Sequence, residues 1–123
     1  MQTLGYNYRL PDLNAALGLS QMNRFDEGLA RRRFIAKKYD KAFSNSEIRI
    51  IMPPENVGHA YHLYVIQVDD RLGLYNHLKK RNIFTQVHYI PVHLQPFYKK
   101  IGWKKGDLPV AEVYYEKCLS LPM

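Results

Sequence analysis

The chain has 123 residues, of which 46% are hydrophobic and 24% are charged, and it contains one cysteine. This length and composition are typical of one small globular domain. They exclude an internal disulfide, and no apolar run approaches the roughly 20 residues that a membrane-spanning helix needs. Because no basic segment followed by an apolar one opens the sequence, we expect no signal peptide, no membrane partner and a cytoplasmic location.

The formal net charge of +7 has two interpretations. It favours contact with phosphate, whether in a nucleic acid, a nucleotide sugar or a phosphorylated cofactor. Lysines on solvated helix faces would give the same charge without any ligand.

Two helices are predicted in the first third of the chain. Residues 1–10 are expected to be extended, and Pro11 and Asp12 then suit the first turn of a helix. The second helix is predicted over residues 25–43. Its predicted apolar face consists of Phe25, Leu29, Ala36, Tyr39 and Phe43, joined by the stem of Arg32. Phe34 lies on the opposite face and indicates a second contact surface.

The remainder predicts a mixture of strands and helices. Strands are expected at 48–52, 59–68 and 83–89, helices at 71–82 and 109–119, and loops at 90–108. The strand at 59–68 is apolar on both sides, which indicates burial of both faces. The most economical arrangement of these elements is an α+β fold in which helices cover one face of a short antiparallel sheet.

The segment Gly5-Tyr6-Asn7-Tyr8-Arg9 directly precedes the first helix. The amide of Asn7 and the guanidinium of Arg9 suit phosphate oxygens, and unpaired N–H groups at a helix start favour anions. The alternative is structural: Asn7 would cap the helix and Tyr6 would fill the core.

A second set of candidates lies near the predicted strand at 83–89. His88, Tyr89 and His93 could present imidazoles and a phenol to a hydroxylated or phosphorylated substrate. The alternative is that one of the histidines merely hydrogen-bonds the loop backbone. His59 and His62 could in principle join these histidines at a metal, but the spacings match no zinc signature, and we expect no metal site.

Several segments together resemble one protein family. They are Gly5 to Arg9, Asn14 to Gln21, Arg31 to Arg33, His62 to Tyr64 and Val87 to Tyr98. In this order they resemble the DegT/DnrJ/EryC1/StrS family of pyridoxal-phosphate (PLP) dependent sugar-nucleotide aminotransferases. The last segment is most similar to the branch that aminates UDP-linked 4-keto sugars, as in pseudaminic acid biosynthesis.

The resemblance implies a C-terminal piece of a fold-type I aminotransferase. Residues 1–45 would form a motif loop and linking helices, and residues 46–123 the small α+β domain. Asn7 would reach the PLP phosphate of the neighbouring subunit, with Arg9 as a weaker cofactor contact. Substrate contacts are implied for Tyr6, Tyr8, His88, Tyr89 and His93.

The same resemblance implies partners that this chain does not contain. The lysine that forms the Schiff base with PLP belongs to an N-terminal large domain, and no lysine here has a context resembling that site. We therefore expect the chain alone to be inactive, and to need the large domain, a homodimer partner, a nucleotide sugar and an amino donor such as glutamate. No nucleic-acid motif accompanies the basic helix at Arg31 to Arg33.

Two alternatives remain open. One is a diverged family member, such as a sugar dehydratase, that has lost its catalytic lysine. The other is a free-standing basic module that binds nucleic acid or polyphosphate.

Overall fold

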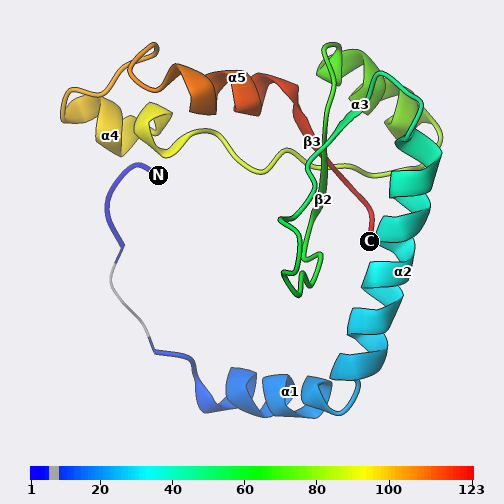
Figure 1. Cartoon of the computed structure of the whole chain (residues 1–123). Coiled ribbons are helices and arrows are strands. Elements are labelled where there is room, and N and C mark those ends of the chain that lie inside the picture. The colour runs from blue at the N-terminus through cyan, green and yellow to red at the C-terminus, as the bar shows by residue number, and fades with distance from the viewer. Residues whose placement is uncertain (6–8) are drawn as a thin grey trace.

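The computed structural model of the chain describes all residues except 6–8. Its elements are α1 (Asp12–Met22), α2 (Phe25–Phe43), β1 (Arg49–Ile50), β2 (Tyr64–Gln67), α3 (Arg71–Lys80), the 3₁₀-helix η1 (Val92–Leu94), α4 (Pro96–Lys100), α5 (Pro109–Lys117) and β3 (Cys118–Leu121). This order and the antiparallel sheet confirm the predicted α+β class (Figure 1).

The sheet has the order β1-β2-β3, with both pairings antiparallel. In the central pairing Tyr64 lies opposite Leu121, and Ile66 lies opposite Leu119. On its other side β3 is bridged by Gln86, so β3 lies between β2 and this segment although it is the last element along the chain. The sheet is therefore held together by contacts that are distant in sequence.

The core forms where helices cover one face of this sheet. Tyr64, Ile66 and Leu119 are buried there together with Ala36 of α2. Leu74 and Leu78 of α3 pack against the same cluster. The Tyr64 hydroxyl donates to Asp40 Oδ1 at 2.7 Å, which anchors α2 on the sheet. Burial, followed by this hydrogen bond, raises the pKa of Tyr64.

The predicted face of α2 is largely confirmed. Ala36 is fully buried, and Leu29, Tyr39 and Phe43 are partly buried on the same side. Phe25 is an exception, because it is half exposed at the start of the helix. Phe34, predicted on the opposite face, is also exposed; its ring lies beneath the charged ends of Arg31 and Lys38, at 5.4 and 4.7 Å from the ring centre.

Three strand predictions need correction. The strand expected at 48–52 has two residues, and the one at 59–68 has four, with its second face only partly buried. The strand at 83–89 is wrong: the segment alternates in burial like a strand, with Thr85 buried and Phe84 exposed, but it forms only the Gln86–Ser120 bridge. Alternating burial of side chains shows that the backbone is extended. A β-strand also needs backbone hydrogen bonds to a neighbouring strand along its length.

The last predicted helix, 109–119, is also too long. It ends at Lys117, because the next four residues pair with β2 as β3. The region 90–108, expected to be loops, contains η1 and the short α4, which begins at Pro96 in a position where proline is well tolerated.

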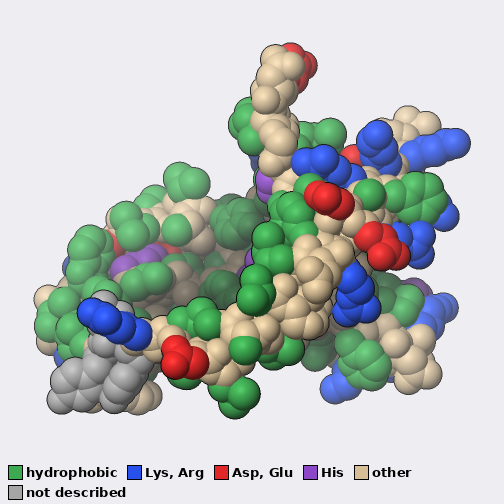
Figure 2. Space-filling model, turned by 90° about the horizontal axis from the view of Figure 1, so that it is seen from below, with side chains coloured by type: hydrophobic (Ala, Val, Ile, Leu, Met, Phe, Trp, Pro, Cys, Tyr) green, Lys and Arg blue, Asp and Glu red, His purple; other side chains and the backbone are tan. Residues whose placement is uncertain are grey.

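The helix α1 buries none of its residues, and Leu13 is 82% exposed. Figure 2 views the molecule from the side on which α1 lies, and it shows hydrophobic side chains along the helix and around a hollow beside it. An apolar helix surface of this kind normally packs against another body. In the part of the chain that the structure describes, no helix has both the length and the apolar character for crossing a membrane.

The first prediction concerns the contribution of the core to stability. Ile66→Ala should lower the free energy of unfolding by about 2–5 kcal/mol, because Ile66 is fully buried and its truncation leaves a cavity. The control is Leu72→Ala on α3, where the side chain is 68% exposed and about 0.5 kcal/mol or less is expected. Urea unfolding followed by circular dichroism measures both, and equal losses would contradict the packing described here.

Candidate functional site

Three of the predicted site residues, Tyr6, Asn7 and Tyr8, lie outside the described residues. Arg9 is described and exposed, just before α1. The N-cap position of α1 is held by Pro11, with no side-chain hydrogen bond to the helix. Because Asn7 itself lies outside the described residues, both of its interpretations, phosphate contact and helix cap, stay predictions.

The segment that carries His88 is fixed on the outer edge of β3. Gln86 and Ser120 exchange two backbone hydrogen bonds, of 3.2 and 2.8 Å. Two residues further on, His88 Nδ1 lies 2.8 Å from Ser120 Oγ. Ser120 is only 5% exposed, so this serine joins the strand, the segment at 86–88 and the imidazole at one buried point.

His88 lines a pocket between α2 and the end of β3, which we call the Arg32–His88 pocket. Its volume is about 260 Å³. Its polar lining comes from Arg32, His62, Gln86, His88 and Ser120. Among the described side chains that line it, one is a permanent cation and none is a carboxylate, although Met123, whose α-carboxylate ends this sequence, also lines it. The pocket can therefore offer hydrogen-bond donors and positive charge to a ligand.

Arg32 is held in place from α2. Its Nη1 donates to the carbonyl oxygens of Tyr61 and His62, at 3.2 and 3.3 Å. The neighbouring Arg33 donates from Nε to the His59 carbonyl oxygen at 3.2 Å. Two of the three consecutive arginines thus fix the segment before β2, a role that their charge alone did not reveal.

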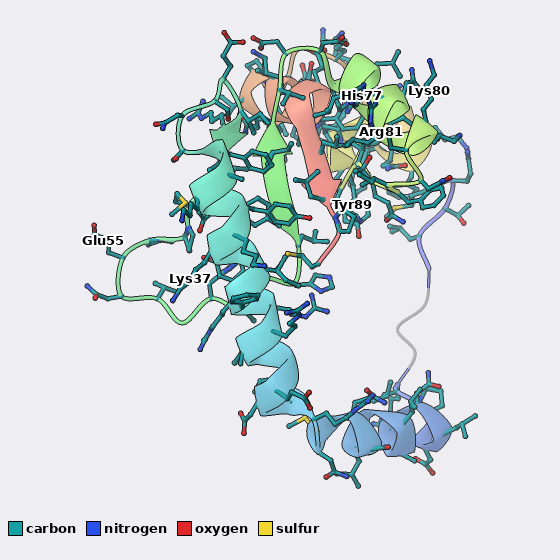
Figure 3. The ribbon with its side chains drawn as sticks, turned by 90° about the vertical axis from the view of Figure 1, so that its right-hand side faces the viewer. Lys37, Glu55, His77, Lys80, Arg81 and Tyr89 are labelled. Atoms are coloured by element: carbon teal, nitrogen blue, oxygen red, sulfur yellow. The ribbon has the colours of Figure 1, made fainter. Side chains whose placement is uncertain are left out.

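Tyr89 directly follows His88 but does not share its burial. Its side chain is 71% exposed. Figure 3 shows Tyr89 beside the C-terminal end of β3. The structure thus brings His88 and Tyr89 together at the edge of the sheet, with the phenol on the outside.

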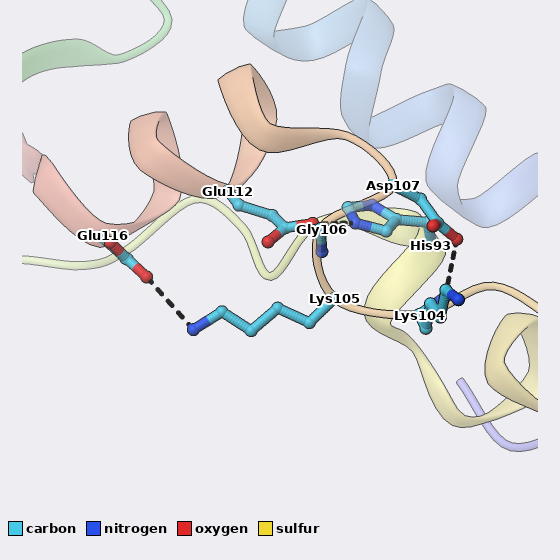
Figure 4. A network of polar contacts seen from close by, with 7 residues as sticks. All are labelled: His93, Lys104, Lys105, Gly106, Asp107, Glu112 and Glu116. Carbon is cyan, nitrogen blue, oxygen red and sulfur yellow. Dashed lines mark hydrogen bonds and ion pairs between the residues drawn. The ribbon is translucent and has the colours of Figure 1, made fainter.

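His93 has a different environment from His88. It is 4% exposed, and its Nε2 lies 2.8 Å from Glu112 Oε1, which also accepts the Gly106 N–H at 2.8 Å. Figure 4 shows this cluster, in which the carboxylate of α5 ties η1 to the loop after α4. The geometry supports a role in holding the loop, and substrate contact by His93 stays a prediction.

The hydrogen bond to His93 holds the pKa of Glu112 below its usual value, against the opposing effect of burial. The Gly106 N–H contributes in the same direction. The carboxylate is thus kept ionised in a site that is nearly closed to solvent, where a negative charge needs its partners.

The described lysines do not fit covalent attachment of PLP. All of them are exposed except Lys117, which is half-buried. Its Nζ lies 2.6 Å from Asp69 Oδ1 on the surface. A Schiff-base lysine needs an enclosed setting that lowers the pKa of its amine, so no reaction step through PLP can be assigned to these residues.

Other charged groups of the described chain have structural partners. In a larger hollow beside α3, Asp70 accepts the Gly73 N–H as the helix N-cap, and Asp69 pairs with Lys117. At the other end of α3, His77, Lys80 and Arg81 point outward (Figure 3), where cations favour the helix C-terminus. Over the described residues, no group of three or more His, Cys, Asp or Glu side chains could hold a metal ion.

The fold of this chain occurs in solved aminotransferases. DesV of S. venezuelae, solved in complex with a ketimine intermediate, has a TM-score of 0.87 and 31% identity, covering 99% of this chain and 33% of DesV. The PLP form of Streptococcus pneumoniae Spr1654 has a TM-score of 0.85 and 32% identity, covering 98% of this chain and 32% of that protein. The class is therefore that of fold-type I aminotransferases.

The family follows from the sequence match. The model of the DegT/DnrJ/EryC1/StrS aminotransferase family matches residues 1–123, so the chain belongs to this family. Among curated relatives, the spore coat polysaccharide biosynthesis protein SpsC of Bacillus subtilis strain 168 is 42% identical, covering 100% of this chain and 34% of SpsC. The chain spans about a third of the length of the relatives it matches.

The second prediction concerns the effect of the His93–Glu112 pair on the pH dependence of stability. Because the pKa of Glu112 is lower in the folded state than its usual value of 4.5, its stabilising effect is present above that value and is lost as the pH falls through the lowered pKa. Glu112→Gln should therefore weaken the loss of stability that occurs as the pH falls from about 5 through the lowered pKa.

The control for this prediction is Glu116→Gln on the same helix. Glu116 is exposed and lies 3.6 Å from Lys105, so its removal should leave the acid dependence close to that of the unchanged chain. Urea midpoints measured across the pH range compare the three proteins. A Glu112→Gln curve parallel to the unchanged one would show that this carboxylate is not responsible.

Proposed function

We propose that the chain is the C-terminal part of an aminotransferase that transfers an amino group to a keto sugar carried on a nucleoside diphosphate. The observation that carries this proposal is the family match over residues 1–123. PLP would supply the chemistry by accepting the amino group from a donor, for which we propose glutamate, and passing it to the sugar. The UDP-4-keto-sugar branch stays a prediction.

In this proposal the chain provides contacts rather than the reacting lysine. His88 and Tyr89 would meet the sugar nucleotide at the edge of β3, and Asn7 would bind the cofactor phosphate of the neighbouring subunit. The division at residues 45 and 46 and the substrate roles of Tyr6, Tyr8 and His93 remain predictions, as does a cytoplasmic location.

The proposal also gives the uncovered surface of α1 a partner. Leu13, Leu17 and Leu19 are exposed over the length of the helix, and the relatives are about three times as long as this chain. We propose that the large domain, or the second subunit of a homodimer, covers this helix. Burial of such side chains stabilises by about 1.5–3 kcal/mol each when complete.

The third prediction concerns activity of the chain by itself. Because its lysines are surface groups, the purified chain should not transfer an amino group from glutamate to a nucleotide-linked 4-keto sugar, even with added PLP. Chromatography of the nucleotide sugar, coupled to detection of 2-oxoglutarate, measures both products. Turnover above the rate of free PLP would contradict the proposal that the reacting lysine lies outside this chain.

The fourth prediction concerns Asn7 in the longer protein that contains this chain. Asn7→Ala should weaken cofactor retention roughly tenfold or more, because a hydrogen bond to a charged phosphate is lost. The control is Asn45→Ala, an exposed asparagine that follows α2. PLP absorbance after dialysis measures retention, and equal retention in both variants counts against the role of Asn7.

A further inference from the structure

We propose that the Arg32–His88 pocket is an oxyanion-binding subsite, in which Arg32 supplies the positive charge and Ser120 holds His88 as a hydrogen-bond donor. The family match does not assign Arg32 or Ser120 to ligand binding. The inference rests on the proposed function only for the identity of the natural ligand, and its physical basis is the pocket itself.

The first argument is the charge of the lining. Arg32 lies in the pocket with two imidazoles, an amide and a hydroxyl, and none of the described lining side chains is acidic. The hollow beside α3 shows the opposite pattern, because Glu47, Asp69 and Asp70 line it. An anion would be repelled there and attracted to Arg32, and a site with one cation and several neutral donors is typical of oxyanion recognition.

The second argument is that Arg32 has donors to spare. A guanidinium carries five N–H groups, and the two carbonyl contacts of Arg32 both use Nη1. Within the described residues no hydrogen bond is made by its Nε or Nη2. The carbonyl contacts hold the guanidinium plane in place before a ligand arrives, which lowers the entropic cost of binding.

The third argument is the arrangement of His88. Its Nδ1 is occupied by Ser120 Oγ at 2.8 Å, which leaves Nε2 as the ring nitrogen available to a ligand. When the serine hydroxyl donates to Nδ1, the proton of a neutral imidazole resides on Nε2, and the ring is a donor on that side. Ser120 is itself fixed by backbone bonds to Gln86 and by pairing with Val65, so it is a positioning residue.

Two natural ligands share the required chemistry under the proposed function. One is the diphosphate of the sugar nucleotide, and the other is a carboxylate of the amino donor. Both present oxygens that accept from a guanidinium fork and an imidazole N–H. Inorganic phosphate and glutamate are therefore the two probes, with uridine as the uncharged comparison.

The experiment uses the 123-residue chain with an amidated C-terminus, so that the α-carboxylate of Met123 does not compete in the pocket, and with ¹⁵N in its histidines. Phosphate or glutamate should shift the His88 ring resonances in a saturable way, and the probe that binds more tightly identifies the source of the oxyanion. Arg32→Gln should raise the dissociation constant about tenfold or more, since a charge-assisted hydrogen bond is lost. The matched control Arg31→Gln, on the exposed side of α2, should leave it within about twofold.

The Ser120 variants test the positioning role separately from the charge. Ser120→Ala should move the His88 ¹⁵N shifts toward a mixture of tautomers and weaken binding, whereas Ser120→Thr, which keeps the hydroxyl, should restore both. A purely structural serine would change stability and leave the tautomer unaltered. Circular dichroism monitors folding. If Arg32→Gln unfolds the chain, the His88 tautomer and the anion binding of the two Ser120 variants still test the proposal.

Two results would overturn the inference. Equal weakening by Arg31→Gln and Arg32→Gln would show attraction to the overall charge only. A response of His88 to uridine but to neither anion would reject the oxyanion subsite while leaving His88 as a substrate contact of the proposed function. Transamination by the longer protein, measured independently, shows whether that function stands when the subsite fails.

Discussion

The antiparallel pairing of β2 with β3 is the constraint on which the rest of the structure depends. It places Ile66 and Leu119 on the face covered by α2 and α3, and it places Ser120 on the opposite face beside His88. Side chains alternate along a strand, so a slip of one residue would turn Leu119 toward the pocket and Ser120 toward the core. The same register therefore determines both the stability of the sheet and the composition of the pocket.

The four longer helices were predictable, apart from where the last one ends, because their signals are local. The face of α2 repeats with helical periodicity, and Pro11 with Asp12 marks the start of α1. β3 was not predictable in this way, since its partner β2 lies more than fifty residues earlier in the chain and local pattern cannot report such a pairing. The available signal was the alternation in Leu119-Ser120-Leu121, but the predicted helix at 109–119 included the first two residues of β3.

The candidate site shows the same division between local and distant information. His88 and Tyr89 could be selected from their residue types and their position near the end of an extended segment. The distinction between His88, which lines a pocket, and His93, which is enclosed with Glu112, depends on partners 32 and 19 residues away. Arg32 and Ser120 went unnoticed as pocket residues because an arginine on a helix and a serine near a helix end are commonplace in sequence.

The position of β3 has a consequence for co-translational folding. Helices α1 and α2 can form as soon as they leave the exit tunnel, since their hydrogen bonds are local. The sheet cannot close until residues 118–121 have emerged, because they supply the partner of β2 and the anchor for Gln86. Until then Tyr64 and Ile66 are left on an open strand edge, which is available for pairing with the wrong strand.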